Sequence, residues 1–444
     1  MSFLLEKFEE YAELPAIIFL GKTFNYRDLL VKYAEAEEFI GDKNIKEGEV
    51  VSLTSDFTPN TIALILALVN NNNIIVPFTY SLKETEEIKF DIAKVQKSIF
   101  VNADDCYTLE EKGGTGEHEL YATIRGRNNP GLVLFTSGTS GFPKGAVHDF
   151  SKLLEKFKTV RRSMRTVNFL LFDHWGGLNT MFHTLSNGGA VLTLKDRRPQ
   201  PVCAFIEKHK IELLPASPTF LNLLLMSEEY RNYDLSSLQV ISYGTEPMPS
   251  STLERLKKVF PTVKLQQTYG LIELGVLRSK SKSDDSLWVK IGGEGYQTRI
   301  IDNLLEIKAE SAMLGYLNAP SPFTQDGWFR TNDEVEVDGE YIKILGRKSE
   351  IINVGGEKVY PAEVESVIQE INNVAEVTVY AEKNPIMGNI VCAKVRLIEE
   401  EDKKAFTVRL KSYCNQKLAS FKVPVKVSIE NEQQYNERFK KKRV

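Results

Sequence analysis

The chain has 444 residues, 42% of them hydrophobic and 26% charged, so it is too long for a peptide or a lone binding module and long enough for about three domain-sized units. Its 56 lysines and arginines are balanced by 60 aspartates and glutamates, and the formal net charge of −4 disfavours a nucleic-acid function. The longest uninterrupted apolar run, residues 62–69, is far shorter than the roughly twenty residues of a membrane span. Because the N-terminus lacks a secretion signal, we expect a cytoplasmic protein without membrane contact.

Strand and helix patterns alternate over most of the chain. After residue 45, a polar turn leads to the apolar run VVSLT, then to a helix-period stretch around NTIALILALV, and then to IIVPF. This order predicts a strand, helix and strand unit. Residues 131–135 are another buried-strand candidate, and LQVISYG is a strand that ends at Gly244 and precedes a helix over 247–260. Such β-branched runs between helices are typical of parallel sheets, so we expect an α/β fold.

The pattern changes from about residue 350. Pro361 suits the first turn of a helix. Behind it lies an apolar stripe made of Val364, Val367, Ile368 and Ile371. The runs AEVTVYA and IVCAKVRL then alternate as half-buried strands do. This region predicts a second, smaller α+β domain of about one hundred residues.

The most informative motif is TSGTSGFPKG at residues 136–145. Backbone N–H groups and side chains of such a loop can surround phosphate oxygens. The loop differs from a Walker motif because Pro143 precedes Lys144 and Gly145 follows it. A flexible solvent loop is the alternative interpretation, and the ordered string disfavours it. The residues that form the predicted anion cradle are Thr136, Ser137, Gly138, Thr139, Ser140, Gly141 and Lys144.

This string resembles the phosphate-loop signature of the ANL superfamily of adenylate-forming enzymes, which includes acyl- and aryl-CoA ligases and peptide-synthetase adenylation domains. Further segments resemble that superfamily in the expected order, namely FDHWGGLNTMFHTLSNGG (172–189), SYGTEPM (242–248), TYGLIE (268–273) and RTNDEVEVDGEYIKILGRKSEIINVGGEKVYPAEVE (330–365). The resemblance implies a large N-terminal α/β domain with layered sheets over residues 1–348. It also implies a small, mobile α+β C-terminal domain over 349–444, joined at a hinge.

The resemblance also implies roles for individual residues. Lys144, loop N–H groups and a magnesium ion held by Glu273 would stabilise charge on pyrophosphate. Asp333 would accept hydrogen bonds from the ribose hydroxyls, and Arg347 would contact ribose or phosphate. Nucleotide-binding positions around the adenine are Gly244, Thr245, Glu246, Pro247, Tyr269 and Gly270. Gly355 and Gly356 would line a pantetheine channel after domain rotation.

His174 takes the place of a histidine near the acyl pocket in this superfamily. The other candidate pocket residues are Trp175, Gly176 and Asn179, which suggest a small or medium acid with some polarity. Asp173 leaves recognition of a substrate amine open. Each of these roles has an ordinary alternative, because His174 and Tyr269 fit satisfied core side chains, and Glu273 and Asp333 fit capping or surface carboxylates.

Three positions depart from the superfamily pattern. Ile272 stands where a threonine usually contacts the adenylate phosphate, and Ser349 replaces the usual charged hinge residue. The usual C-terminal lysine, which bridges carboxylate and α-phosphate, falls within QYNERFKKK. Alignment on the YN pair puts Arg438 there, and a shift of two places puts Lys440 there. We expect the terminal FKKKRV to be a solvated tail.

Two functions from different classes follow. In the first, ATP and a carboxylic acid give an acyl-adenylate, and coenzyme A then displaces AMP; a carrier-protein thiol or an amine is the alternative acceptor. In the second, the altered C-terminus marks a catalytically weakened relative that only binds a nucleotide or adenylate. The sequence leaves open which acid is used and the oligomeric state, a homodimer included.

Overall fold

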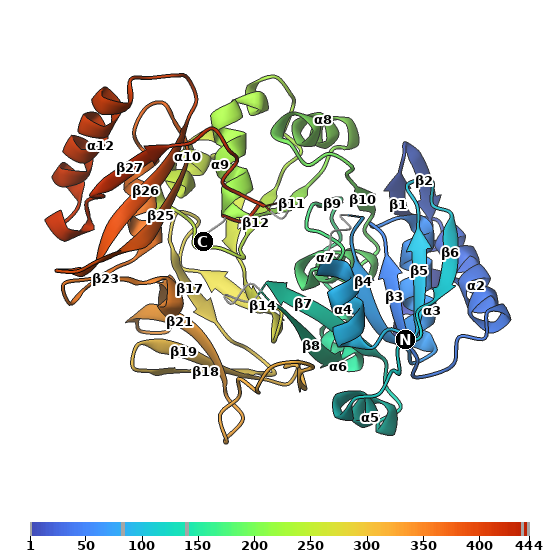
Figure 1. The fold of residues 1–444 in the computed structure, drawn as a ribbon. Helices are drawn as coiled ribbons and strands as arrows, with labels where there is room; N and C mark the ends of the chain where they lie inside the picture. The colour runs from blue at the N-terminus through green and yellow to red at the C-terminus, as the bar shows by residue number, and fades with distance from the viewer. Residues whose placement is uncertain (1, 81–84, 138–141, 437–438, 442–444) are drawn as a thin grey trace.

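The computed structural model describes residues 2–80, 85–137, 142–436 and 439–441, with the side chains of Thr85 and Ser137 excepted. Figure 1 shows the N-terminal part as several sheets with helices packed against them and the C-terminal part as a smaller unit beside α9 and α10. The predicted α/β fold with layered sheets and a small C-terminal α+β domain is confirmed.

The first sheet has the strand order β13-β12-β11-β9-β10-β1-β2, and only the β1–β2 pair is antiparallel. Its strands are β1 (Pro15–Phe19), β2 (Lys22–Asn25), β9 (Thr166–Asn168), β10 (Val191–Thr193), β11 (Leu213–Ala216), β12 (Val240–Tyr243) and β13 (Lys264–Gln267). The carboxyl end of β12 therefore opens toward the same edge as its parallel neighbours, which is where ligands bind in open α/β sheets.

The second sheet has the order β20-β8-β7-β4-β3-β5-β6. Its strands are β3 (Val50–Thr54), β4 (Ile74–Phe78), β5 (Lys97–Val101), β6 (Tyr107–Glu111), β7 (Gly131–Ser137), β8 (Pro143–Asp149) and β20 (Gly315–Tyr316). The predicted unit of strand, helix and strand is confirmed as β3, α3 and β4, whose two strands pair in parallel.

Two further sheets complete the N-terminal part. One has the order β16-β17-β22-β21-β19-β18, and the other is the hairpin β14-β15. Their strands are β14 (Tyr269–Leu271), β15 (Gly275–Leu277), β16 (Ser279–Ser281), β17 (Trp288–Ile291), β18 (Tyr296–Ile301), β19 (Leu304–Ala309), β21 (Phe329–Asp338) and β22 (Tyr341–Arg347).

The C-terminal sheet has the order β24-β23-β26-β25, and β27 pairs with β26. Its strands are β23 (Ile352–Val354), β24 (Glu357–Val359), β25 (Val374–Asn384), β26 (Gly388–Leu397) and β27 (Lys426–Ile429). Pro361 opens a helix as the sequence predicts, and the stripe behind it packs into the C-terminal core, fully at Val364 and Ile368.

Helices cover these sheets. The α-helices are α1 (Ser2–Glu10), α2 (Tyr26–Asp42), α3 (Pro59–Asn70), α4 (Thr85–Ala93), α5 (Glu119–Gly126), α6 (Phe150–Leu154), α7 (Trp175–Leu185), α8 (Pro199–His209), α9 (Pro218–Ser227), α10 (Ser250–Val259), α11 (Pro361–Ile368) and α12 (Lys403–Lys417). Short 3₁₀ turns lie at η1 (Glu155–Lys158), η2 (Glu229–Arg231), η3 (Lys348–Glu350) and η4 (Ser420–Lys422).

The helix α3 explains the longest apolar run of the sequence. Its residues from Ile62 to Val69 are at most 3% exposed, and they share one hydrophobic cluster with Ile17 of β1 and Leu53 of β3. A helix buried between two sheets has no solvent face, so it is apolar all round. The described chain contains no helix long and apolar enough to cross a membrane.

Candidate active site

The strands β7 and β8 hold the two ends of the predicted phosphate loop. They pair antiparallel, with Thr136 opposite Lys144 and Ser137 opposite Pro143. The loop residues Gly138, Thr139, Ser140 and Gly141 lie outside the described residues. The backbone therefore brings Thr136 and Lys144 side by side at the loop's base, as the motif requires.

Asn318 fixes the exit of this loop from a distant part of the chain. Its Oδ1 accepts a 3.1 Å hydrogen bond from the Gly145 N–H, and its Nδ2 donates to the Pro143 carbonyl at 2.9 Å. Asn318 was missed by the sequence reasoning because no motif marks it. Its position depends on the pairing of β20 with β8.

Tyr316 joins two of the predicted residues. The Lys144 Nζ lies 5.7 Å from the centre of the Tyr316 ring, and the Tyr316 hydroxyl donates a 2.5 Å hydrogen bond to Glu273 Oε1. Burial, and then the neighbouring Glu273 carboxylate, raise the pKa of Tyr316, so the hydroxyl keeps its proton for this bond. The structure thus gathers Lys144 and Glu273 around one ring that the motifs did not include.

Asp333 and Arg347 face each other on paired strands, at opposite register positions of β21 and β22. Asp333 is 6% exposed, accepts a 2.6 Å hydrogen bond from the Tyr269 hydroxyl, and lies 3.6 Å from Arg347 Nε through its other oxygen. Burial raises the pKa of Asp333, while the Tyr269 hydrogen bond and Arg347 act in the opposite direction. Burial and Asp333 hold the pKa of Tyr269 well above its usual range.

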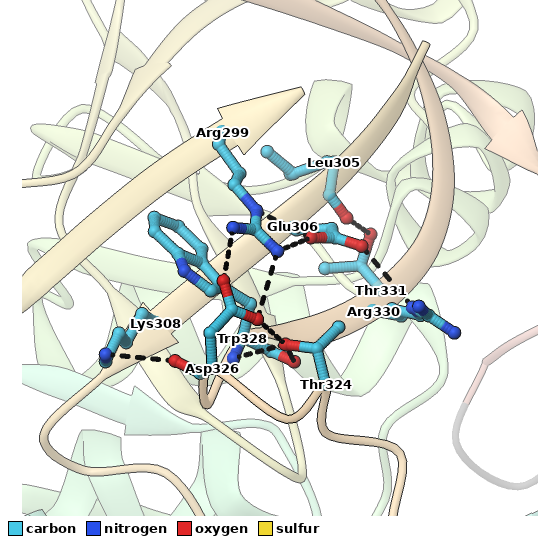
Figure 2. Close-up of polar contacts among 9 residues, drawn as sticks. All are labelled: Arg299, Leu305, Glu306, Lys308, Thr324, Asp326, Trp328, Arg330 and Thr331. Atoms are coloured by element: carbon cyan, nitrogen blue, oxygen red, sulfur yellow. Dashed lines mark hydrogen bonds and ion pairs between the residues drawn. The ribbon is translucent and has the colours of Figure 1, made fainter. Parts of the chain in front are cut away.

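A polar network steadies the strand that carries Asp333 (Figure 2). Arg299 of β18 pairs with the buried Glu306 of β19 at 2.7 Å, and its guanidinium lies 4.4 Å from the centre of the Trp328 ring. Glu306 also pairs with Arg330 of β21 at 3.4 Å. On the same strand, Thr331 Oγ1 accepts the Asp333 N–H at 3.0 Å. Because both side chain and backbone of Asp333 are held, its carboxylate has a fixed direction.

The segment after β12 makes a tight approach to the start of β14. A β-carbon at Gly244 would lie 2.5 Å from Thr268 Oγ1 and 2.6 Å from the Thr268 carbonyl oxygen, so only glycine fits. Thr245 has a φ of +74°, which is uncommon for a residue with a side chain. A β-carbon at Gly270 would lie 2.8 Å from the Gly275 carbonyl. Pro247 follows in the same loop.

Ile272 packs, partly buried, against two hydrophobic clusters. The isoleucine that replaces the usual threonine therefore contributes apolar packing at this position.

His174 is the N-cap of α7, where its Nδ1 accepts a 3.0 Å hydrogen bond from the Gly176 N–H. It also lines a pocket with Phe169, Leu170, Leu171, Arg197, Thr245, Phe439 and Lys440. Of the other pocket candidates, Trp175 is 2% exposed within the core, and Asn179 lies one turn further along α7. The structure therefore brings His174, Thr245 and Lys440 together from three distant segments.

The C-terminal tail docks onto the N-terminal part, and the expectation of a solvated tail is wrong for residues 439–441. Phe439 is 9% exposed, and its ring centre lies 5.5 Å from those of Phe169 and Phe220. Lys441 Nζ lies 2.8 Å from the buried Glu365 carboxylate. Arg438 lies outside the described residues.

Gly355 and Gly356 form the turn of the β23–β24 hairpin in the C-terminal sheet, with φ values of +60° and +96°. A β-carbon at Gly355 would meet only the flexible end of the Met387 side chain, so the turn requires glycine because of its backbone conformation. Neither residue is among those that line the pocket with His174 and Lys440.

Comparison with known families identifies the chain. The family model for AMP-binding enzymes matches residues 4–306, and the model for the C-terminal domain of AMP-binding enzymes matches residues 363–440. The chain belongs to the AMP-binding enzyme family. The predicted membership of the ANL superfamily of adenylate-forming enzymes is confirmed.

Several relatives of this AMP-binding enzyme are CoA ligases. It is 26% identical over 462 residues to the 2-succinylbenzoate–CoA ligase of Bacillus pumilus (strain SAFR-032), covering 95% of this chain and 92% of that protein. It is 23% identical over 504 residues to the long-chain-fatty-acid–CoA ligase of Bacillus subtilis (strain 168), covering 95% and 89%. The crystal structure of the anthranilate CoA ligase AuaEII with anthranoyl-AMP shares the fold, with a TM-score of 0.81, 19% identity, and 99% and 95% coverage.

The residues of this AMP-binding enzyme fit a magnesium ion. Among the described residues, no group of three or more His, Cys, Asp or Glu side chains could hold a metal by itself. Magnesium does not need such a group, because it retains several waters and binds through one or two carboxylates together with substrate phosphates. Glu273, near Lys144 and the base of the phosphate loop, is a carboxylate of the required kind.

Proposed function

We propose that this enzyme is an ATP-dependent acid–thiol ligase that joins a small or medium carboxylic acid to coenzyme A. The carboxylate attacks the α-phosphate of ATP, pyrophosphate leaves, and the CoA thiol then displaces AMP from the acyl-adenylate. The observation that carries the proposal is the pocket in which Lys440 meets His174 and Thr245. The CoA-ligase names of relatives that cover nearly the whole chain support it.

Adenylation requires positive charge around the phosphates. Lys144, at the base of the phosphate loop, and the loop N–H groups would stabilise the charge that develops on pyrophosphate. A magnesium ion bound by Glu273 and the phosphates would supply further charge neutralisation. Tyr316 orients Glu273 through its hydrogen bond, and its ring lies 5.7 Å from the Lys144 ammonium.

The nucleotide would be held by groups already fixed in direction. Asp333 would accept hydrogen bonds from the ribose hydroxyls, since Tyr269 and Thr331 hold its side chain and backbone. Arg347 would contact ribose or phosphate. The tight segment from Gly244 to Pro247 would bracket the adenine, because its backbone lies at the carboxyl end of β12.

Lys440, and not Arg438, is our choice for the lysine that bridges the carboxylate and the α-phosphate. The family motif has a glycine immediately before this lysine, and Phe439 adopts a φ of +50°, the conformation that glycine favours. Lys440 also lines the pocket with His174. An alignment shifted by two places from the YN pair therefore explains both the positive φ of Phe439 and the position of the Lys440 charge in the pocket.

We also propose that the chain divides at residues 348/349, within η3, and that the 349–444 domain rotates between the two half-reactions. In the present orientation, Lys358 Nζ lies 2.6 Å from Glu334, and Ser250 Oγ lies 3.2 Å from Ser366 Oγ. Rotation would break these polar contacts and would also release the docked tail, in which Phe439 packs against Phe169 and Phe220. Rotation would then bring Gly355 and Gly356 to the CoA thiol channel in place of Lys440.

Two assays test the function. Pyrophosphate exchange into ATP over a panel of carboxylic acids reports adenylation, and thioester formation with added CoA reports the second step. Exchange with at least one acid, followed by CoA-dependent AMP release, is the expected result. Exchange without CoA turnover would point to a carrier protein or an amine as acceptor. ATP binding without any exchange would favour the weakened relative. We assign the reaction to the cytoplasm, where ATP and CoA are available.

A further inference from the structure

The C-terminal tail folds into a closed loop around Lys440. Tyr435 and Lys441 pair antiparallel, and the Asn436 N–H donates a 2.9 Å hydrogen bond to the Lys440 carbonyl. The Asn436 side-chain oxygen accepts the Lys440 N–H at 3.1 Å. These bonds fix the backbone of Lys440 relative to both ends of the loop. The described residues of this tail loop are 434–436 and 439–441.

Both ends of the tail loop are bound to buried carboxylates of the C-terminal domain. At the start, the Gln434 N–H donates a 2.8 Å hydrogen bond to Glu376 of β25, which is 6% exposed. At the end, Lys441 Nζ lies 2.8 Å from Oε2 of Glu365 in α11, which is 1% exposed. Oε1 of Glu365 accepts the Val379 N–H of β25 at 2.9 Å, so the direction of this carboxylate is fixed. The tail loop is therefore attached to the C-terminal domain at two points.

Lys441 contacts both parts of the molecule. Its side chain pairs with Glu365 of the C-terminal domain, and its backbone N–H donates to Glu246 in the segment after β12. The adjacent Lys440 lines the pocket with His174. A movement of the Lys441 backbone would therefore displace Lys440 relative to this pocket.

The ion pair is the contact that fixes the Lys441 ammonium. Lys441 lines a cavity between α9, β25 and the tail loop, so its side chain is not closely packed on that side. The side chain is nevertheless only 15% exposed, and that of Glu365 is 2% exposed. A charged hydrogen bond between such groups is strong and directional, and removing one partner leaves a buried charge without compensation.

We propose that Lys441 is a positioning residue whose ion pair with Glu365 clasps the tail loop to the C-terminal domain. Because both partners belong to this domain, its rotation would break the Glu246 contact and leave the clasp intact. The tail loop would then carry Lys440 into the pocket for adenylation and out of it for thioester formation. This inference rests on the proposed ligase function, to which it adds a residue that acts through Lys440.

The two half-reactions, measured separately, test the clasp. Lys441→Met should lower the single-turnover rate of adenylation by about tenfold, because Lys440 is then less often in place. The KM for ATP and the reaction of a supplied acyl-adenylate with CoA should stay within about twofold, since neither depends on Lys440. Lys441→Arg keeps the positive charge and should recover most of the lost rate.

Lys422→Met is the matched control. Lys422 Nζ lies 2.6 Å from Glu363 of the same helix α11, and its side chain is 20% exposed. Among the described residues, Lys422 has no hydrogen bond with the tail loop. A general loss of stability in the C-terminal domain would affect both variants alike, whereas loss of the clasp affects only Lys441→Met.

A double variant covers the case in which Lys441→Met does not fold. Lys441→Met combined with Glu365→Gln removes both charges, so no lone charge stays buried, and the glutamine can still accept the Val379 N–H. This double variant should show the same selective loss of adenylation.

Hydrogen exchange of the tail-loop amides, without substrates, separates the clasp from the ligase function. Exchange should be faster by about tenfold or more in Lys441→Met and in the double variant, and unchanged in Lys422→Met. If the parent enzyme adenylates no acid, faster exchange still supports the clasp, and the failure belongs to the proposed function. Unchanged exchange in the folded variants overturns the inference. Adenylation that is unaffected, or that falls to the same extent as thioester formation, also overturns it.

Discussion

The backbone N–H of Lys441 donates a 2.7 Å hydrogen bond to Oε1 of Glu246, the residue after Thr245 in the segment that follows β12. The other carboxylate oxygen of Glu246 accepts the Thr219 hydroxyl at 2.6 Å, so this acceptor is fixed. On the other side of Lys440, the Phe439 carbonyl accepts a 2.8 Å hydrogen bond from Ser217. Lys440 is therefore held by both of its neighbours.

Replacing Lys440 should affect only the adenylation half-reaction. We expect Lys440→Ala to lower adenylation by roughly 100-fold or more, because a positioned charge on the transition state is lost. Reaction of a supplied acyl-adenylate with CoA should stay within twofold. Pyrophosphate exchange and thioester formation measure the two steps separately. Lys404→Ala, on the exposed side of α12, is the control. If Lys440→Ala lowers the rates of both steps equally, the assignment of Lys440 to adenylation is wrong.

The Phe439 ring should position Lys440 without touching the reacting atoms. Removing a buried phenyl ring costs about 3 kcal/mol, and the tail should then dock more weakly. We expect Phe439→Ala to lower adenylation by at least about tenfold, and Phe439→Gly to lower it less, because glycine favours the positive φ at this position. Single-turnover adenylation rates for the two variants give the comparison. The reverse order would show that backbone conformation has no part in positioning Lys440.

Tyr269→Phe should weaken the proposed ribose contact. The variant removes the hydrogen bond that holds Asp333 and lowers its pKa, so that pKa should rise further. The KM for ATP should increase by roughly tenfold, and the acidic limb of the pH profile of kcat/KM should move to higher pH. Tyr296→Phe, which removes only a 3.2 Å contact with Ser311, is the control. If the acidic limb does not move, Asp333 does not contribute to nucleotide binding.

Gly244→Ala should destabilise the segment that follows β12. The new methyl group would meet the Thr268 carbonyl and hydroxyl, and overpacking of this kind costs about 1–3 kcal/mol. A matched substitution is Gly41→Ala in α2, where a β-carbon has no neighbour within 4 Å and alanine favours the helix. Chemical unfolding should show a lower free energy of unfolding for Gly244→Ala. The free energy of unfolding of Gly41→Ala should not be lowered. Equal stability would mean that the segment can move away from Thr268.

Burial, together with Arg161 and Arg278, lowers the pKa of Lys156 from its usual 10.5 to about 8, and this shift has a consequence for stability. Between about pH 8 and 10.5, Lys156 binds fewer protons in the folded state than in the unfolded state. The free energy of unfolding should therefore rise with pH in this window by the contribution of this group. Lys156→Met should flatten that rise, and chemical unfolding at several pH values measures it.

Much of the fold could be predicted from local patterns. The strand at 50–54, the helix that follows and the strand at 74–78 appear at those places, because runs of buried side chains fix both the element and its period. The site was predicted only where one segment carries a whole chemical pattern, as TSGTSGFPKG does. Tyr316 and Asn318 carry no such pattern, and they reach the site only because β20 pairs with β8.

The sequence by itself determined the family, the α/β and α+β character of the two parts, and the segments that bear the chemistry. Only the tertiary structure decided that Lys440 reaches the pocket and that the tail is docked. The physical reason is that local conformation and chemical type are properties of neighbouring residues. The approach of charges from distant segments depends on how buried surfaces pack, as when Phe439 packs against Phe169 and Phe220 and so places Lys440 at the pocket.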